Sequence, residues 1–185
     1  GRETLDHGAN IAAAHVDSPR LDLKPIPLYE KDEICLLKTH YYGGIKKYQW
    51  VAIPLALHGV IVRKTGEKVI INIGEDENDP VFCISDLLVH LAQEQMTKNA
   101  KEVVEGEALN LIVGGRPLEG EEKDAVKANV LKLLADKYGV EEEDFLSAEL
   151  EIVPAGKARD MGFDRSMILG YGHDDRVCAY PSMMA

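Results

Sequence analysis

The apolar positions of the chain are densest in its first half. Residues 50–63 are almost uninterrupted apolar sequence with a glycine at Gly59, which predicts one bent strand or two. Thr65-Gly66 then gives a turn signal before a second apolar run, so residues 57–73 are expected to form a β-hairpin. The acidic residues 74–80 that follow lack the EF-hand spacing and are typical of a solvated loop.

A helical pattern is strongest between residues 121 and 138. Its apolar residues recur at i, i+4, i+7, i+8 and i+12, which places them on one face of a helix, and Gly139 is a natural helix stop. These residues are Val126, Val130, Leu133, Leu134 and Tyr138. We therefore expect an amphipathic helix that packs one side on the core.

Two further elements complete the predicted fold. Ser85 can cap a second helix that runs over residues 86–99 with several leucines toward one side. Residues 148–152 alternate between polar and apolar positions, as in a strand that is exposed on one face. Because strands and helices do not interleave regularly, the pattern favours an α+β fold over a doubly wound sheet.

Both ends of the sequence resemble cut ends of a longer polypeptide. The chain starts with Gly1 rather than methionine, and the apolar residues 10–14 run directly into His15 as a short buried strand would. Residues 180–185 stop without a helix cap or a charged tail. We expect the 185 residues to be a segment of a larger protein.

The charge balance narrows the range of partners. Lys and Arg number 21 against 32 Asp and Glu, which gives a net charge of −11. A nucleic-acid binder or a protein of anionic membrane surfaces needs a basic footprint, which is missing. No apolar run reaches the roughly 18 residues of a membrane span. The three cysteines are widely separated, which argues against a disulfide framework or a thiolate zinc site. We therefore expect the protein in a reducing cytoplasm.

Two places carry residues suited to metal chemistry. His15 and Asp17 are two positions apart, so on an extended segment they project to the same side, and the carboxylate can hold the second ring nitrogen of a histidine ligand. In Gly172-His173-Asp174-Asp175-Arg176, adjacent residues diverge on a strand, so only one acid is expected to be a primary ligand. A surface histidine near a turn and a surface ion-pair cluster are the open alternatives.

The ordered set of short motifs resembles a known family. The motifs are His15-Val16-Asp17-Ser18-Pro19-Arg20, Tyr42-Gly43-Gly44-Ile45, Pro54-Leu55-Ala56-Leu57-His58-Gly59-Val60 and Gly172-His173-Asp174-Asp175-Arg176. Together they look like the aspartyl aminopeptidase / aminopeptidase I family of di-zinc metalloaminopeptidases, nearest to its bacterial branch. The resemblance covers essentially the whole chain.

The resemblance implies a division into domains. Family members have an α/β catalytic domain that is interrupted by a β-rich dimerisation domain, and their dimers assemble into a tetrahedral dodecamer. On this mapping, residues 1–20 and 160–185 are edges of the catalytic domain. Residues 21–159 are the inserted dimerisation domain, with about two helices, so the fold class remains α+β.

The resemblance also implies roles for individual residues. His15 matches a zinc ligand, Asp17 the acid that orients it, and Asp174 the carboxylate that bridges two zinc ions, with cobalt or manganese as alternatives. His90, in the segment Ser85-Asp86-Leu87-Leu88-Val89-His90-Leu91, matches a histidine that reaches the neighbouring subunit's active site and contacts the substrate carbonyl. The substrates implied are peptides, from which N-terminal residues are removed.

Departures from the family pattern limit these expectations. Relatives that prefer acidic N-terminal residues carry Phe-Asp-Arg after the tryptophan, where this chain has Val51-Ala52-Ile53, so acidic specificity is not implied. The family's Glu-Glu pair, a further acidic ligand and a final histidine are expected downstream of Ala185. The segment alone is therefore expected to be inactive. The alternatives are a non-catalytic oligomerisation module and an unrelated acidic α+β domain with chance motifs.

Overall fold

The computed structural model describes residues 4–185, which divide into two compact units. The terminal unit comprises residues 4–18 together with Ala158–Ala185, and the central unit is Pro19–Lys157. Each boundary lies two residues from the division that the sequence suggested at 20/21 and 159/160. The two units are described separately.

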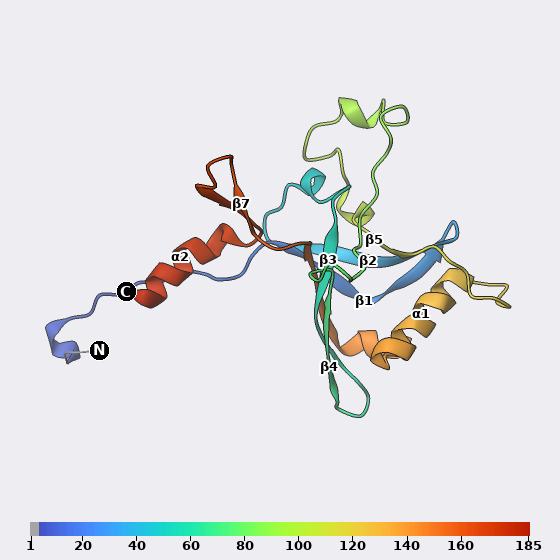
Figure 1. Ribbon diagram of the computed structural model, residues 1–185, viewed down its shortest axis with the longest axis horizontal. Helices are drawn as coiled ribbons and strands as arrows, with labels where there is room; N and C mark the ends of the chain where they lie inside the picture. Colours follow the sequence, from blue (N-terminus) through green and yellow to red (C-terminus); the bar gives the residue numbers. More distant parts are fainter. Residues whose placement is uncertain (1–3) are drawn as a thin grey trace. The chain divides into compact units, whose positions relative to one another are not determined.

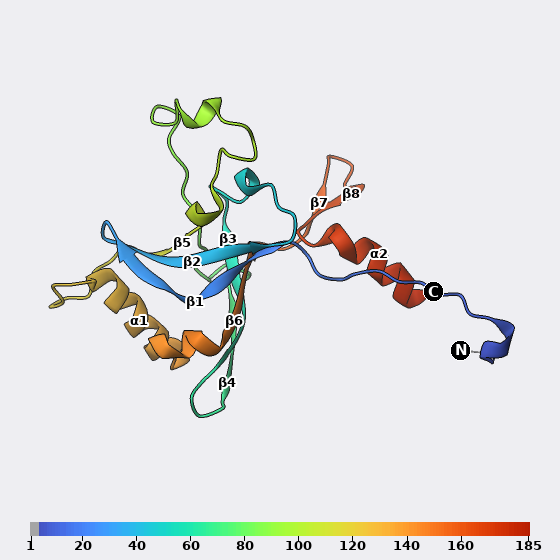
Figure 2. The same ribbon diagram turned by 180° about the vertical axis from the view of Figure 1, so that it is seen from behind.

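The central unit is built on a six-stranded antiparallel sheet with the strand order β4-β3-β6-β1-β2-β5 (Figures 1 and 2). Its strands are β1 (Arg20–Lys31), β2 (Ile34–Tyr42), β3 (Leu55–Val62), β4 (Lys68–Ile73), β5 (Leu111–Gly114) and β6 (Ala148–Pro154). The hairpin expected over residues 57–73 is confirmed by the pairing of β3 with β4. The strand expected over residues 148–152 is confirmed as β6, which lies between β3 and β1.

A short connecting segment closes this sheet into a ring. Phe82 exchanges two backbone hydrogen bonds with Leu55 of β3, at 2.8 and 2.9 Å, and the Ile112 amide of β5 donates to the Cys83 carbonyl at 2.9 Å. The path β3-β6-β1-β2-β5 therefore returns to β3 through residues 82–83. The result is a small barrel-like ring, which protects sheet edges from unpaired exposure.

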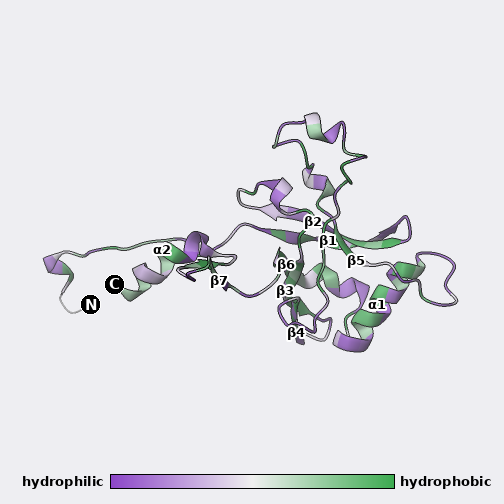
Figure 3. Ribbon diagram, turned by 45° about the horizontal axis from the view of Figure 1, so that its top comes forward, coloured by the Kyte–Doolittle hydropathy of each residue, from purple (hydrophilic) through white to green (hydrophobic). Residues whose placement is uncertain are grey.

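Apolar side chains line the inside of the ring. Apolar segments gather on the strands and along α1, whereas the connecting loops are mostly hydrophilic (Figure 3). Some of the most deeply buried side chains come from four of the strands: Leu21 of β1, Leu55 and Ile61 of β3, Leu111 of β5 and Ile152 of β6. Burial of this kind is the main favourable contribution to folding.

The helix predicted before Gly139 is confirmed. It is α1 (Ala125–Tyr138), which packs against β1, β2 and β5. Val126 and Val130 are buried as the pattern required, and Gly139, at φ +61°, ends the helix in the left-handed conformation that favours glycine. The helix begins four residues after the predicted start at residue 121, behind Asp124 at φ +49°.

The helix expected over residues 86–99 is wrong. These residues form turns and only a short 3₁₀ segment, η3 (Gln95–Thr97). Leu87, Leu88 and Leu91 are each more than half exposed. A helix of this length is marginal without an apolar surface to pack on, which explains the failure of the local pattern. The other 3₁₀ segments are η1 (Leu5–His7), η2 (Lys47–Gln49), η4 (Gly106–Ala108) and η5 (Glu142–Ser147).

The terminal unit contains the two-stranded sheet of β7 (Arg159–Met161) and β8 (Met167–Leu169), followed by α2 (His173–Met184). The strand expected over residues 10–14 is wrong, because those residues are exposed and irregular. A strand needs a hydrogen-bonding neighbour, and within the described residues of this unit β7 and β8 pair with each other. In the part of the chain that the structure describes, no helix has the length and apolar character needed to cross a membrane.

The start of α1 is capped by a side chain that is remote in sequence. One carboxylate oxygen of Glu30, on β1, accepts hydrogen bonds from the Val126 and Lys127 amides, both at 2.9 Å. Asp124, the residue before the helix, makes no capping bond with its own side chain. Glu30 thus supplies the acceptor that a local Ser, Thr or Asp usually provides.

We expect Glu30→Ala to lower the free energy of unfolding by about 1–2 kcal/mol, because two helical amides lose their acceptor and the helix N-terminus loses a negative charge. Urea denaturation followed by circular dichroism measures the change. The control Glu119→Ala removes an exposed acid in the loop before α1 and should change the free energy of unfolding by no more than about 0.5 kcal/mol. Equal midpoints for the two variants would contradict the capping role.

Candidate metal centre

The terminal unit brings together an imidazole and two carboxylates from opposite ends of the chain. His15 Nε2 lies 2.9 Å from Asp175 Oδ2 and 4.0 Å from Asp174 Oδ1. One ligand atom from each of the three residues lies within 4.8 Å of the others, the spacing of side chains that can share one metal ion. Local sequence patterns could not have shown this convergence, since the partners are more than 150 residues apart.

The second ring nitrogen of His15 is held by Asp17. The distance from His15 Nδ1 to Asp17 Oδ1 is 3.2 Å, so these side chains do project together, although the segment is not a strand. Desolvation acts to lower the pKa of His15, but the carboxylates of Asp175 and Asp17 outweigh it and raise the pKa above its ordinary value. The arrangement leaves Nε2 directed at the two acids, which is how a metal-binding histidine is usually oriented.

The two acids stand in an irregular turn where α2 begins. Gly172, at φ +86°, precedes the turn, and the backbone angles of Asp174 and Asp175 are not helical. The Ser18 hydroxyl donates a 2.8 Å hydrogen bond to the Asp174 carbonyl, which ties the turn to the segment that carries His15. The side chain of Asp174 is 82% exposed and that of Asp175 only 15%.

The expectation that adjacent acids diverge is wrong here. It assumed a strand, whereas the irregular turn lets both carboxylates approach His15, and Asp175 lies nearer than Asp174. Sequence reasoning did not assign Asp175 to the metal. The only signal available was its position beside Asp174.

A thiol supports the nearer acid. The Cys178 side chain donates a hydrogen bond to Asp175, and this bond together with the negative charge raises the pKa of the Cys178 thiol. Cys178 follows Asp175 by three residues, just after the non-helical turn at the start of α2. Neither Cys178 nor Ser18 was singled out from the sequence.

His90 belongs to the central unit and is not part of this cluster. It lies on the exposed segment after Ser85, where Asp86, Leu91 and Gln95 line the same shallow cleft. The Gln95 amide ties this segment together through hydrogen bonds to the Asp86 carboxylate and the Val103 carbonyl, at 2.8 and 3.1 Å. The imidazole of His90 is therefore presented on the surface of the central unit.

The donor set suits zinc. Zinc binds histidine nitrogen and carboxylate oxygen in tetrahedral or five-coordinate sites, and a metal-bound histidine commonly gives its other nitrogen to a carboxylate. His15, Asp174 and Asp175 offer one nitrogen and two oxygen donor atoms, and Asp17 is the partner of the second ring nitrogen. The cluster therefore has the donor set of a metal site with mixed nitrogen and oxygen ligation.

Comparison with known proteins identifies the family. The model of the family described as "Aminopeptidase I zinc metalloprotease (M18)" matches residues 1–185. A probable M18 family aminopeptidase 1 from Clostridium acetobutylicum is 63% identical over 186 residues, which is all of this chain and 40% of that protein. The chain belongs to the M18 family of zinc metalloproteases.

Solved structures agree on the fold. The crystal structure of the M18 aminopeptidase from Thermotoga maritima superimposes with a TM-score of 0.90 at 56% identity, covering 95% of this chain and 39% of that one. The S. cerevisiae mApe1 dodecamer matches at a TM-score of 0.61 and 20% identity, over 94% of this chain and 37% of that one, which shows likeness of fold alone. The chain spans about 40% of the length of the relatives it matches.

Proposed function

We propose that this chain is a segment of a zinc-dependent aminopeptidase that hydrolyses N-terminal residues from peptides. The observation that carries the proposal is the convergence of His15 with Asp174 and Asp175 in a member of a zinc metalloprotease family. The same residues are assigned to metal binding, with Asp17 orienting His15.

The residues of the segment would have different roles in the site. His15, Asp174 and Asp175 would hold zinc, which would supply Lewis-acid polarisation of the peptide carbonyl and a more acidic water when bound. His15 offers Nε2 as a ligand, and Asp17 keeps the Nδ1 proton on the other side of the ring. Ser18 and Cys178 hold the turn of the acids through their hydrogen bonds, so that the carboxylates keep a fixed position.

The donor count supports the expectation that the segment alone does not turn over substrate. Two zinc ions need about four ligands each, and three side chains cannot provide them. We assign the general base and the remaining ligands to the part of the polypeptide that corresponds to the other 60% or so of the relatives' length.

We also place the protein in a reducing compartment, the cytoplasm, because Cys35, Cys83 and Cys178 are all free.

The second candidate function, self-association, concerns the central unit. Its segment from Ser85 to Met96 exposes Leu87, Leu88 and Val89, each more than half accessible. Exposed apolar residues in such a cluster are typical of an interface. We propose that this unit forms dimers, that His90 reaches a neighbouring active site, and that the dimers build a dodecamer as in the S. cerevisiae relative.

The experiment compares the full-length protein with the segment. The full-length protein, loaded with zinc, cobalt or manganese, should hydrolyse a panel of aminoacyl anilides, lose activity with a chelator and regain it with metal. The segment should be inactive under the same conditions. An inactive full-length protein with bound metal would refute the proposal, and turnover by the segment would refute the assignment of missing ligands. A strictly monomeric segment at micromolar concentration, measured by light scattering, would contradict self-association.

A further inference from the structure

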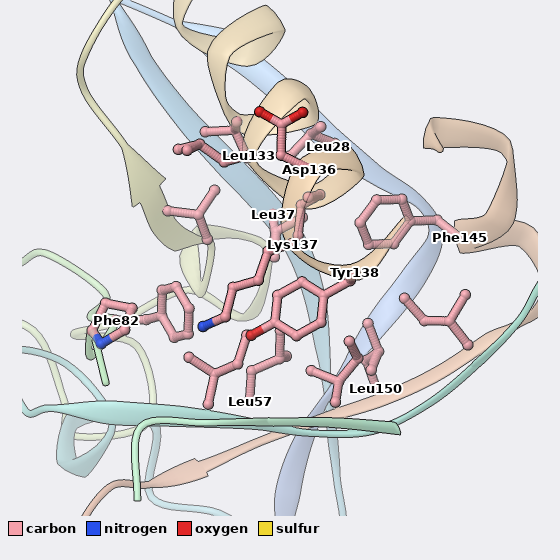
Figure 4. A pocket seen from close by; sticks show the side chains of 17 residues that line it. Leu28, Leu37, Leu57, Phe82, Leu133, Asp136, Lys137, Tyr138, Phe145 and Leu150 are labelled. Carbon is pink, nitrogen blue, oxygen red and sulfur yellow. The ribbon is translucent and has the colours of Figure 1, made fainter. Parts of the chain in front are cut away.

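The central unit contains an apolar cavity of about 430 Å³ between α1 and the sheet. Every strand of the sheet contributes to its wall, as do α1 and residues 80–82. Figure 4 shows Leu57 and Leu150 on one side, Phe82 and Phe145 at its ends, and α1 with Tyr138 on the opposite side. All of these residues belong to the central unit, so the cavity is independent of the metal cluster.

The position and size of the cavity are those of a ligand site. The ring closed by Phe82 and Cys83 leaves this space at its α1 end, and mouths of β-barrels are common places for small ligands. A dry apolar cavity of about 150 Å³ already takes up benzene, and this one is roughly three times larger. Its wall is mostly apolar, and it is open to solvent on one side, where the exposed Leu133, Asp136 and Lys137 lie, so a ligand can enter there.

One end of the cavity is polar and carries a lysine. Lys137 and Tyr138 both line it, and the Lys137 ammonium donates a hydrogen bond to the Tyr138 hydroxyl. Figure 4 shows the ammonium and the hydroxyl close together on the inner side of α1. Two acids lie near this end: Asp136, which is already paired with Lys132 one turn earlier on the helix, and Asp79, whose charge acts on Lys137. Lys137 and the Tyr138 hydroxyl are the donors that this end offers to a ligand.

We propose that the cavity binds an aliphatic monocarboxylate, with its hydrocarbon chain between α1 and the sheet and its carboxylate at Lys137 and Tyr138. The apolar wall accommodates the chain, and the ammonium and hydroxyl are the donors that a carboxylate needs. A neutral alcohol of the same length would keep the apolar contacts and lose the ionic one. This proposal does not depend on metal binding or peptidase activity.

Titration calorimetry with decanoate and 1-decanol tests the proposal. Decanoate should bind the chain saturably, with one molecule per central unit, and 1-decanol should bind more weakly. Lys137→Met should weaken decanoate binding by about fivefold, the upper range for an exposed ion pair, and leave 1-decanol binding unchanged. Lys123→Met, which removes an exposed lysine just before α1, is the matched control and should change neither.

A second variant tests whether the ligands bind inside the cavity rather than on the surface. Val113 lines the cavity from β5, and Val113→Phe should fill it and weaken both ligands by at least about tenfold. Circular dichroism and the melting temperature check that this variant folds. If it does not fold, the comparison of Lys137→Met with Lys123→Met tests the proposal. Absence of saturable binding, equal effects of Lys137→Met and Lys123→Met, or undiminished binding by folded Val113→Phe would each overturn the proposal.

Discussion

Replacing His15 by alanine in the full-length protein should lower kcat/KM for an aminoacyl anilide by more than about a hundredfold. Loss of a residue that only supports a ligand costs about 10–100-fold in metal affinity or activity, and His15 is placed as a ligand itself. Its Nε2 is the nitrogen that faces Asp174 and Asp175, 2.9 Å from the latter. The variant should also purify with less zinc, which elemental analysis measures independently of activity.

Two further variants test whether the loss of activity is specific to the metal-binding role of His15. Asp17→Asn keeps the size of the side chain but weakens its hold on Nδ1, so it should cost about 10–100-fold, less than His15→Ala. His40→Ala removes an exposed histidine of β2 and should leave both zinc content and kcat/KM unchanged. Full activity and zinc content in His15→Ala would remove the basis for the metal site.

The parts of the fold that the sequence predicted correctly are those in which local pattern and packing agree. The α1 residues Val126 and Val130 have the spacing of one helix face, and both are buried against the sheet. Residues 86–99 have an apolar spacing that also suggests a helix, yet their leucines are exposed and the segment forms turns. Periodicity alone does not reveal whether a core lies within reach of a segment.

The geometry of the candidate site could likewise be predicted only where it depends on local sequence. The pairing of His15 with Asp17 follows from a spacing of two, which is local information. Its approach to Asp174 could be expected only through family resemblance, because the residues are remote in sequence. Asp175 was not assigned, since its position depends on the irregular backbone at the start of α2 rather than on any periodic pattern.

Gly59→Ala should lower the free energy of unfolding by about 3–4 kcal/mol or prevent folding. Gly59 lies in the middle of β3 at φ +139°, where other residues are strained by about 1–3 kcal/mol. A Cβ at this position would lie 1.9 Å from the carbonyl oxygen of Glu149 and 3.1 Å from the Cα of Leu150, on the neighbouring strand β6. Overpacking of this kind typically costs about 1–3 kcal/mol more.

The clash falls on the backbone of the sheet, which cannot rotate away as a flexible side chain could. Glu149 and Leu150 are paired with Val60 and Gly59 of β3, and β6 pairs with β1 from the next residue on, so β6 has little freedom to move away. Gly115→Ala is the matched control, because a Cβ there meets no atom within 4 Å, and it should leave stability unchanged or raise it by up to about 1 kcal/mol. Urea denaturation of the two variants measures the difference. A Gly59→Ala midpoint equal to that of Gly115→Ala would mean that β3 and β6 do not pair at this register.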